Sequence, residues 1–279
     1  MALIKTSELL ISARENHYAV GAFNVANMEM IMGAMQAAEE MQSPIILQVA
    51  EGRLGYSPFH LIAPMLVEAA RTSSTQVAVN FDHGKSLSYI QKALDIGFSS
   101  VMIDYSHDSL VNNIQMTNQV KAIASKYNAS IEAEIGVVGG SEDDSESLQV
   151  KYSNIDDIKS FLEQANPDAL AVAIGNAHGH YQGTPRLNFD LLEQIASLSS
   201  TPLVLHGGTG ISREDFRRGI QLGICKINIA TSSFDAITSS IASAKYDNFF
   251  AISQAMVQAT KENVKTYIEI FQSAGQAKG

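Results

Sequence analysis

Gln76-Val77-Ala78-Val79-Asn80-Phe81-Asp82-His83-Gly84 is a short apolar run that ends in an aspartate and a histidine. The run has the length of a strand, and its nearly continuous apolar character is typical of a parallel strand buried on both faces. His178 and His206 also stand just past the ends of such runs. A histidine at a strand's exit can turn its imidazole toward a common pocket, so we expect these three side chains to meet.

Seven further runs of this kind bring the predicted strands to eight, separated by stretches with apolar residues three and four apart. The predicted strands are Tyr18 to Val25, Pro44 to Val49, Gln76 to Phe81, Ser100 to Ile103, Ser130 to Ile135, Ala169 to Ile174, Pro202 to Leu205 and Lys226 to Ile229. The predicted helices include Met28 to Met41, Leu61 to Ser73, Leu87 to Leu94, Leu110 to Tyr127, Ile155 to Gln164, Asp190 to Ser197 and Arg213 to Leu222. This alternation predicts an α/β fold and favours a closed (β/α)8 TIM barrel, with a doubly wound open sheet as the competing architecture.

Length and composition are consistent with one domain. A barrel of roughly 250 residues plus extensions accounts for the chain, so we expect a single barrel over residues 1–279 with a C-terminal helical extension, Ala251 to Phe271. We also expect a soluble, cytoplasmic protein, because there is no membrane-length apolar run, no basic leader, and no cysteine besides Cys225. The formal net charge of -10 disfavours nucleic acid or an anionic membrane as a partner.

Polar residues follow nearly every predicted strand, at the end where the active site of a barrel lies. The last two exits carry the loops Gly207-Gly208-Thr209-Gly210 and Asn228-Ile229-Ala230-Thr231. Barrels often bind phosphate in the loops after their seventh and eighth strands, where backbone N–H groups face the ligand. One glycine pair is weak evidence, but two neighbouring loops, one of which follows His206, predict a phosphate site.

The three histidines suit a catalytic zinc ion. Zinc held by three neutral imidazoles keeps its charge and an open face, so it can polarise a carbonyl group or hold an enediolate. Asp82, adjacent to His83, is the best candidate base, although an aspartate there can also cap a helix or orient a histidine. For His107 and His180 we favour a place on the surface or behind the ligands.

Seven motifs stand in order along almost the whole chain: Ala22-Phe23-Asn24-Val25, Phe81-Asp82-His83-Gly84, Met102-Ile103-Asp104-Tyr105-Ser106, Glu132-Ala133-Glu134-Ile135-Gly136 through Gly139-Gly140 to Glu142-Asp143-Asp144, Ala173-Ile174-Gly175-Asn176-Ala177-His178-Gly179, Leu203-Val204-Leu205-His206-Gly207-Gly208-Thr209-Gly210-Ile211, and Lys226-Ile227-Asn228-Ile229-Ala230-Thr231. Together they resemble the class II, zinc-dependent aldolases of dihydroxyacetone phosphate, a family that includes fructose-bisphosphate and tagatose-bisphosphate aldolases.

The resemblance implies roles for individual residues. The zinc ligands would be His83, His178 and His206, and Asp104 and Glu134 would hold or orient the metal in alternative positions.

It further implies that Asp82 exchanges a proton with the substrate hydroxyl at the breaking bond and that Glu142 moves a proton at the enediolate carbon. The implied enzyme acts on a small sugar phosphate as a homodimer or homotetramer. The positions expected around substrate, its ketone phosphate and a monovalent cation (Na+ or K+) are Asn24, Gly179, Gly207, Gly208, Thr209, Asn228, Ile229, Ala230 and Thr231.

Two departures from the family pattern concern the acceptor aldehyde. Relatives that cleave bisphosphates carry an Asp-Pro-Arg motif whose arginine grips the second phosphate, whereas the matching stretch here is Tyr246-Asp247-Asn248-Phe249-Phe250. Ala50 replaces a serine that helps to hold that phosphate in some relatives, and no arginine follows Arg218. Phenylalanine cannot imitate a bidentate guanidinium. We therefore predict an acceptor other than glyceraldehyde 3-phosphate, unless Arg53 supplies the charge and keeps fructose and tagatose bisphosphates as substrates.

Three other functions fit parts of the pattern. A class I aldolase needs a strand-borne lysine for a Schiff base, but Lys226 opens the eighth run and is expected at the opposite end of the barrel. A metal-dependent isomerase or epimerase also uses zinc and an enediolate, but it yields a rearranged sugar and no triose. A non-catalytic barrel subunit would have lost the histidine triad, which this chain keeps.

Overall fold

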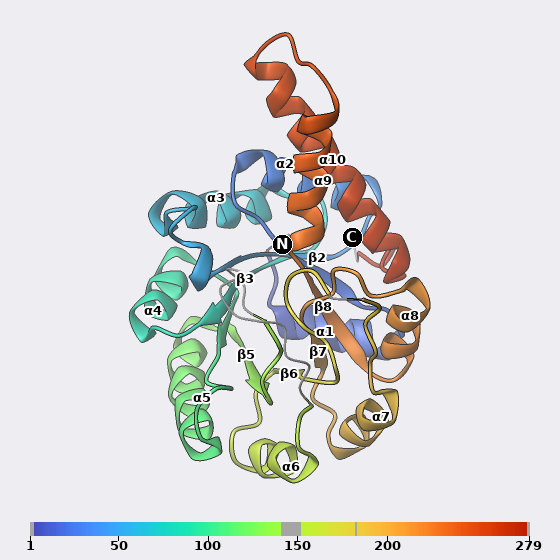
Figure 1. The fold of residues 1–279 in the computed structure, drawn as a ribbon. Helices are drawn as coiled ribbons and strands as arrows, with labels where there is room; N and C mark the ends of the chain where they lie inside the picture. Colours follow the sequence, from blue (N-terminus) through green and yellow to red (C-terminus); the bar gives the residue numbers. More distant parts are fainter. Residues whose placement is uncertain (1–2, 141–151, 182, 278–279) are drawn as a thin grey trace.

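The computed structural model describes residues 3–140, 152–181 and 183–277. Within these residues eight parallel strands pair in chain order and close on themselves, with helices outside them (Figure 1). This confirms the predicted (β/α)8 barrel and excludes the open sheet. The strands are β1 (Val20–Asn24), β2 (Ile45–Ala50), β3 (Val77–Gly84), β4 (Ser100–Ile103), β5 (Ser130–Ile135), β6 (Ala169–Val172), β7 (Leu203–Leu205) and β8 (Ile224–Ile229).

The helices include two, α1 and α9, that the apolar spacing did not predict. They are α1 (Thr6–Glu15), α2 (Met28–Glu40), α3 (Phe59–Thr72), α4 (Leu87–Ile96), α5 (Leu110–Ala124), α6 (Ile155–Gln164), α7 (Phe189–Leu198), α8 (Arg213–Gln221), α9 (Thr231–Ser243) and α10 (Phe249–Ile270), with short 3-10 helices η1 (Glu51–Arg53) and η2 (Ser125–Tyr127). Helix α1 contacts β1, β3, β5 and β8, so it closes the N-terminal end of the barrel.

Helices α9 and α10 form a hairpin that projects from the barrel, and α10 then returns along α2 (Figure 1). The predicted C-terminal stretch, Ala251 to Phe271, corresponds to α10 with a shift of two residues at its start. No helix in the described part of the chain has the length and apolar character needed to cross a membrane.

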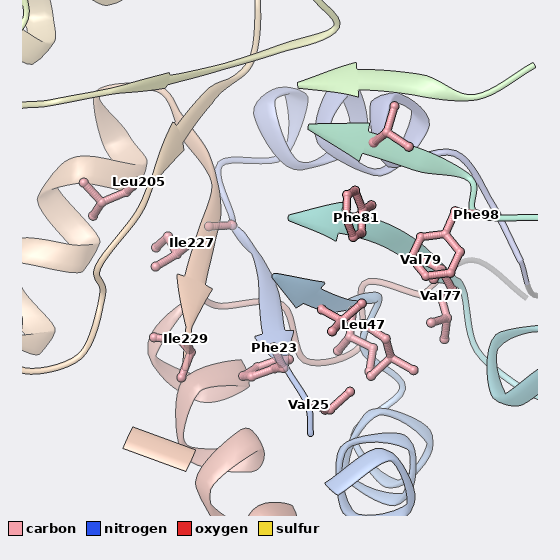
Figure 2. Packing of buried hydrophobic residues seen from close by; sticks show 14 of the residues in the cluster. Phe23, Val25, Leu47, Val77, Val79, Phe81, Phe98, Leu205, Ile227 and Ile229 are labelled. Atoms are coloured by element: carbon pink, nitrogen blue, oxygen red, sulfur yellow. The ribbon is translucent and has the colours of Figure 1, made fainter. Parts of the chain in front are cut away.

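Side chains alternate between the two sides of the barrel wall, as the pleat of a strand requires. Phe23, Val79 and Phe81 point outward into the large apolar layer between strands and helices (Figure 2). The alternate residues point inward, and toward the end closed by α1 they include small apolar side chains such as Ala78 and Ala171. Toward the opposite end the inward residues become polar, and this change locates the site.

Candidate functional site

His83, His178 and His206 meet at the C-terminal ends of the strands, as the sequence predicts. Their ring centroids lie 4.9 Å (His83 to His178), 4.6 Å (His83 to His206) and 5.8 Å (His178 to His206) apart. All three are buried, and one nitrogen of each lies within 4.8 Å of the other two. Three imidazoles converging in this way form a donor set that suits zinc with an open coordination position.

The backbone at His83 explains how Asp82 and His83 both serve one site. Adjacent strand residues normally point to opposite faces. Here the β3–β4 register shifts between Phe81 and Gly84, and His83 has a φ of 46°, in the left-handed region that non-glycine residues rarely adopt. This irregularity allows both side chains to reach the interior, and it is a local strain of the kind that occurs at functional sites.

Carboxylates fix the orientation of two of the rings. His83 Nδ1 lies 2.8 Å from Asp104 Oδ2, and His206 Nε2 lies 2.9 Å from Glu132 Oε1. Because an ionised carboxylate only accepts hydrogen bonds, each of these nitrogens donates. The two remaining nitrogens, His83 Nε2 and His206 Nδ1, face each other at 2.8 Å, a distance at which they share one proton or bind a common cation. A bound metal ion would take the place of that proton, so the residues present fit a metal.

Burial and the neighbouring His83 keep the other two imidazoles neutral. Burial, reinforced by the charge of His83, lowers the pKa of His178 to about 3, and the same causes lower the pKa of His206 well below its ordinary value. Neutral imidazole is the form that binds metal ions.

The two carboxylates predicted beside the metal, Asp104 and Glu134, both lie at the site. Although burial opposes it, hydrogen bonds from His83 and Ser106 hold the pKa of Asp104 well below its usual range. Burial, helped by the charge of Asp104, raises the pKa of Glu134 to about 8. Glu134 Oε2 lies 3.6 Å from His206 Nδ1, and His83, Asp104 and Glu134 form a second group able to hold an ion. Asp104 thus orients His83, whereas Glu134 faces the inner nitrogens.

Asp82 is completely buried and held at both oxygens. Asn24 Nδ2 donates to Oδ2 over 2.9 Å, and Asn228 Nδ2 donates to Oδ1 over 3.2 Å. Burial alone would raise the pKa of Asp82, but the positive charges of His83 and Lys226 outweigh it, and the net shift is downward. Asp82 is therefore an ionised carboxylate that can accept a proton.

A chain of amides stands behind this carboxylate. Asn80 Nδ2 donates to Gln48 Oε1 over 3.2 Å, and Gln48 Nε2 donates to Asn24 Oδ1 over 2.7 Å. The amide of Asn24 is thereby turned with its N–H groups toward Asp82. All three residues point inward and are buried.

Glu132 and Lys226 also belong to the site, although the sequence did not indicate a role for them. The expectation for Lys226 was wrong, because β8 begins two residues earlier, at Ile224. Lys226 is the third residue of the strand, is fully buried, and its Nζ lies 2.8 Å from Glu132 Oε2. The period of two along a strand could have shown this, since Lys226 shares its inward side with Asn228.

The loops after β7 and β8 form a pocket beside the histidines. Gly207 is required there, because its φ is 64° and a Cβ would lie 2.0 Å from the carbonyl oxygen of Ala177. Ser232 N–H, in the first turn of α9, donates to Thr209 Oγ1 over 3.1 Å, so the start of α9 adjoins the pocket. The lining residues are Arg53, His178, Gly179, Gly207, Gly208, Thr209, Asn228, Ala230 and Thr231. Glycine loops and a helix N-terminus suit a phosphate.

Some predicted positions lie elsewhere. Ile229 does not line this pocket but packs in the apolar layer outside the barrel. Asn24 lies beside the candidate base, because its Nδ2 donates to Asp82 Oδ2. His107 and His180 are exposed, as favoured from the sequence. Glu142 lies outside the described residues.

The residues that replace the second-phosphate motif are remote from the pocket of their own chain. Phe249 and Phe250 begin α10 at the turn of the projecting hairpin, with 70% and 79% of their surface exposed. Asn248 caps this helix by accepting a hydrogen bond from Ala251 N–H. Ala50, in contrast, pairs in register with Asp82. Arg53 follows β2, and its guanidinium lies 4.8 Å from the centre of the Phe234 ring.

Three histidines able to hold a metal ion, a buried carboxylate and a glycine-lined pocket at the C-terminal mouth of a barrel are typical of metal-dependent (β/α)8 enzymes. The model of the class II fructose-bisphosphate aldolase family matches residues 4–276, and this chain belongs to that family. It is therefore an aldolase, a lyase that breaks and forms carbon–carbon bonds.

Individual relatives agree with this assignment. The chain is similar to the 6-phospho-5-dehydro-2-deoxy-D-gluconate aldolase of Halalkalibacterium halodurans, with 40% identity over all of this chain and 99% of that one. It is 38% identical to the fructose-bisphosphate aldolase of Staphylococcus aureus, with both chains fully covered. The crystal structure of the YdjI aldolase from Escherichia coli K12 covers 99% of this chain and matches over 100% of its own length, with 33% identity and a TM-score of 0.90.

Proposed function

We propose that this protein is a zinc-dependent aldolase that joins dihydroxyacetone phosphate to an aldehyde and cleaves the product. The observation that carries the proposal is the pair of inward nitrogens on His83 and His206, 2.8 Å apart, whose outer nitrogens both face carboxylates. With His178 they offer three nitrogen donors directly beside a pocket suited to phosphate. Cleavage of a phosphorylated ketone requires a metal site for the ketone oxygen and, next to it, a binding site for the phosphate.

The proposed steps rest on the positions of the described side chains and, for Glu142, on the resemblance to the family. When bound, zinc would polarise the ketone carbonyl and stabilise the negative charge that develops on its oxygen. In the cleavage direction Asp82 accepts the proton of the hydroxyl at the breaking bond, while Asn24 and Asn228 hold its two oxygens. Glu142, which enters this step as the carboxylic acid, then protonates the ketone-phosphate carbon, and after the products leave Asp82 releases its proton to solvent and Glu142 takes one up. The backbone around Gly207 holds the phosphate, together with a monovalent cation.

We propose that the acceptor aldehyde differs from glyceraldehyde 3-phosphate. Ala50, beside Asp82, offers no hydroxyl, and Phe249 stands where bisphosphate-cleaving enzymes carry arginine. One relative is named for a substrate with a phosphate at one end and a carboxylate at the other. Cleavage beside the ketone of such a compound leaves an aldehyde that ends in a carboxylate, and Arg53 lies at the pocket to bind an anionic group.

The acceptor is tested with the zinc-loaded protein, dihydroxyacetone phosphate and a panel of aldehydes. The panel contains glyceraldehyde 3-phosphate, unphosphorylated glyceraldehyde and an aldehyde that bears a carboxylate, and products are identified by NMR and compared by kcat/KM. We expect an aldol product with highest kcat/KM for an aldehyde without phosphate. A strong preference for glyceraldehyde 3-phosphate would remove the acceptor proposal and leave a bisphosphate aldolase. A rearranged sugar without any triose would instead indicate an isomerase or epimerase.

Metal dependence is tested separately. Dialysis against a strong chelator should abolish cleavage, and stoichiometric Zn²⁺ should restore it. Borohydride added with substrate should leave activity intact, because Lys226 is paired with Glu132 and no Schiff base is proposed. Full activity after verified metal removal would overturn the zinc proposal.

A further inference from the structure

A buried contact chain links the interior of the barrel to one metal-binding histidine. Lys226 of β8 and Glu132 of β5 are both 0% exposed, and Lys226 Nζ lies 2.8 Å from Glu132 Oε2. The other oxygen of the same carboxylate, Oε1, lies 2.9 Å from His206 Nε2. His206 in turn presents Nδ1 toward His83 Nε2. Strands β8, β5 and β3 and the loop after β7 therefore contribute one residue each to a continuous series of four polar residues in contact.

A buried lysine at this inward position of the barrel is not explained by packing alone. Nearby inward positions lower in the barrel carry small apolar side chains such as Ala78, Ala171 and Val204, and Val204 pairs in register with Lys226. Burying an ammonium group and a carboxylate is costly, and well-packed apolar residues often replace such a pair without loss of stability. What apolar residues cannot do is to hold Glu132 as an acceptor for the N–H of His206.

We propose that Lys226 is a positioning residue of the metal centre, which acts on the metal through Glu132 and His206. By pairing with one oxygen of Glu132, Lys226 fixes the orientation of the carboxylate, so that the second oxygen accepts a hydrogen bond from His206 Nε2. That contact fixes the tautomer in which Nδ1 carries the lone pair for zinc. The inference rests on the proposed zinc function.

The test compares zinc affinity in four variants. Glu132→Gln and Lys226→Met each remove one charge at nearly constant shape, and the double variant removes both. Lys265→Met is the matched control, because Lys265 forms an ion pair with Glu40 outside the barrel. Affinity is measured by competition with a chromogenic chelator, and folding by circular dichroism.

We expect zinc affinity to fall about 10-fold to 100-fold in each barrel variant, the usual effect of losing a partner behind a ligand. The double variant should resemble the single ones, because both residues act through one contact. Lys265→Met should bind zinc as the wild type does. If a single variant fails to fold, the zinc affinity of the double variant tests the proposal, because that variant leaves no unpaired buried charge. Wild-type zinc affinity in folded barrel variants would overturn the proposal.

A second measurement is independent of metal binding. In the metal-free protein with ¹⁵N-labelled histidine, the nitrogen shifts of His206 should show a proton on Nε2 in the wild type and a mixture of tautomers in the double variant. Identical tautomers in both proteins would also overturn the inference. If the wild type binds no zinc, the proposed function fails, and the tautomer measurement still decides the role of Lys226.

Discussion

Asp82 and His83 are neighbours in the chain, yet they face one pocket with different tasks. His83 offers Nε2 toward the other histidines, and Asp82 is held by Asn24 and Asn228. The sequence shows both residues and their position after a strand. It does not show the positive φ of His83, which depends on the surroundings that hold a sparsely populated backbone conformation in place.

Replacing Asp82 by alanine should remove the base and leave the metal. Because the three histidines do not depend on Asp82 for a hydrogen bond in the described structure, we expect retained zinc with kcat lowered by at least about 10²-fold. Metal content is measured by atomic absorption and turnover by triose release. Asp82→Asn, which keeps the shape and loses the basicity, should be similarly impaired. Normal turnover in either variant would contradict the assignment.

Replacing Arg53 by glutamine should weaken binding of an anionic substrate group. Arg53 lines the pocket beside Gly207 and Thr231, and a charge-assisted contact there makes kcat/KM fall by about 10-fold or more when it is lost. Arg218→Gln is the matched control, since Arg218 also lies over an aromatic ring, that of Phe189, on the outside of the barrel. Equal kcat/KM in the two variants would exclude a substrate role for Arg53.

At the scale of elements, the apolar runs located all eight strands because strands buried on both sides have few polar residues. The boundaries were less accurate where polar residues interrupt a strand. β3 continues through Asp82 and His83 to Gly84, and β8 contains Lys226 in its middle. In both cases the polar residues belong to the candidate site. They interrupt the apolar run inside the strand, and the predicted boundary is therefore misplaced. The apolar spacing did not predict α9, whose first turn adjoins the pocket between the loops after β7 and β8.

The packing of α10 against α2 should depend on pH through Glu40. Contacts with Lys261 and Lys265 of α10 lower the pKa of Glu40 from its ordinary value of 4.5 to about 2. A carboxyl group with a depressed pKa in the folded state stabilises the protein above its unfolded pKa, and this contribution is lost as pH falls from about 4.5 toward 2. Glu40→Gln should therefore lower the urea midpoint of the metal-free protein at pH 7.

The difference in urea midpoint between the wild type and Glu40→Gln should shrink progressively below pH 4.5, as Glu40 becomes protonated. It should also shrink in 1 M salt, because the side chains of Glu40, Lys261 and Lys265 are partly exposed and salt screens their charges. A constant difference from pH 7 to pH 3 would show that the ion pairs contribute nothing.

At the scale of the whole molecule, closure of the barrel creates the site. His83 and His206 are 123 positions apart in the chain, yet their inner nitrogens lie 2.8 Å apart. The eight strands deliver their C-terminal ends to one rim, so the polar residue after each strand becomes part of one surface. This is why most of the site could be predicted from strand exits without any knowledge of side-chain contacts.

We expect the protein to associate as a homodimer or homotetramer through the projecting α9–α10 hairpin. Phe249 and Phe250 are highly exposed and pack edge to face at 5.7 Å, and exposed aromatic clusters commonly mark interfaces. Replacing both by serine should shift the sedimentation coefficient toward the monomer, whereas Val111→Ser, which removes an exposed apolar side chain from α5, should not. A wild-type monomer at micromolar concentration would refute this expectation.

The sequence by itself determined the order of the eight strands, the place of the three histidines and Asp82 at strand ends, and the glycine loop after the seventh strand, because these depend on local periodicity and on residue chemistry at strand ends. Only the tertiary structure decided which nitrogens of His83 and His206 face each other, that Arg53 lines the pocket beside Gly207, and that Lys226 lies inside the barrel. These features depend on register and on side-chain direction across strands that are distant in the chain, and a one-residue difference in either moves a side chain to the opposite face.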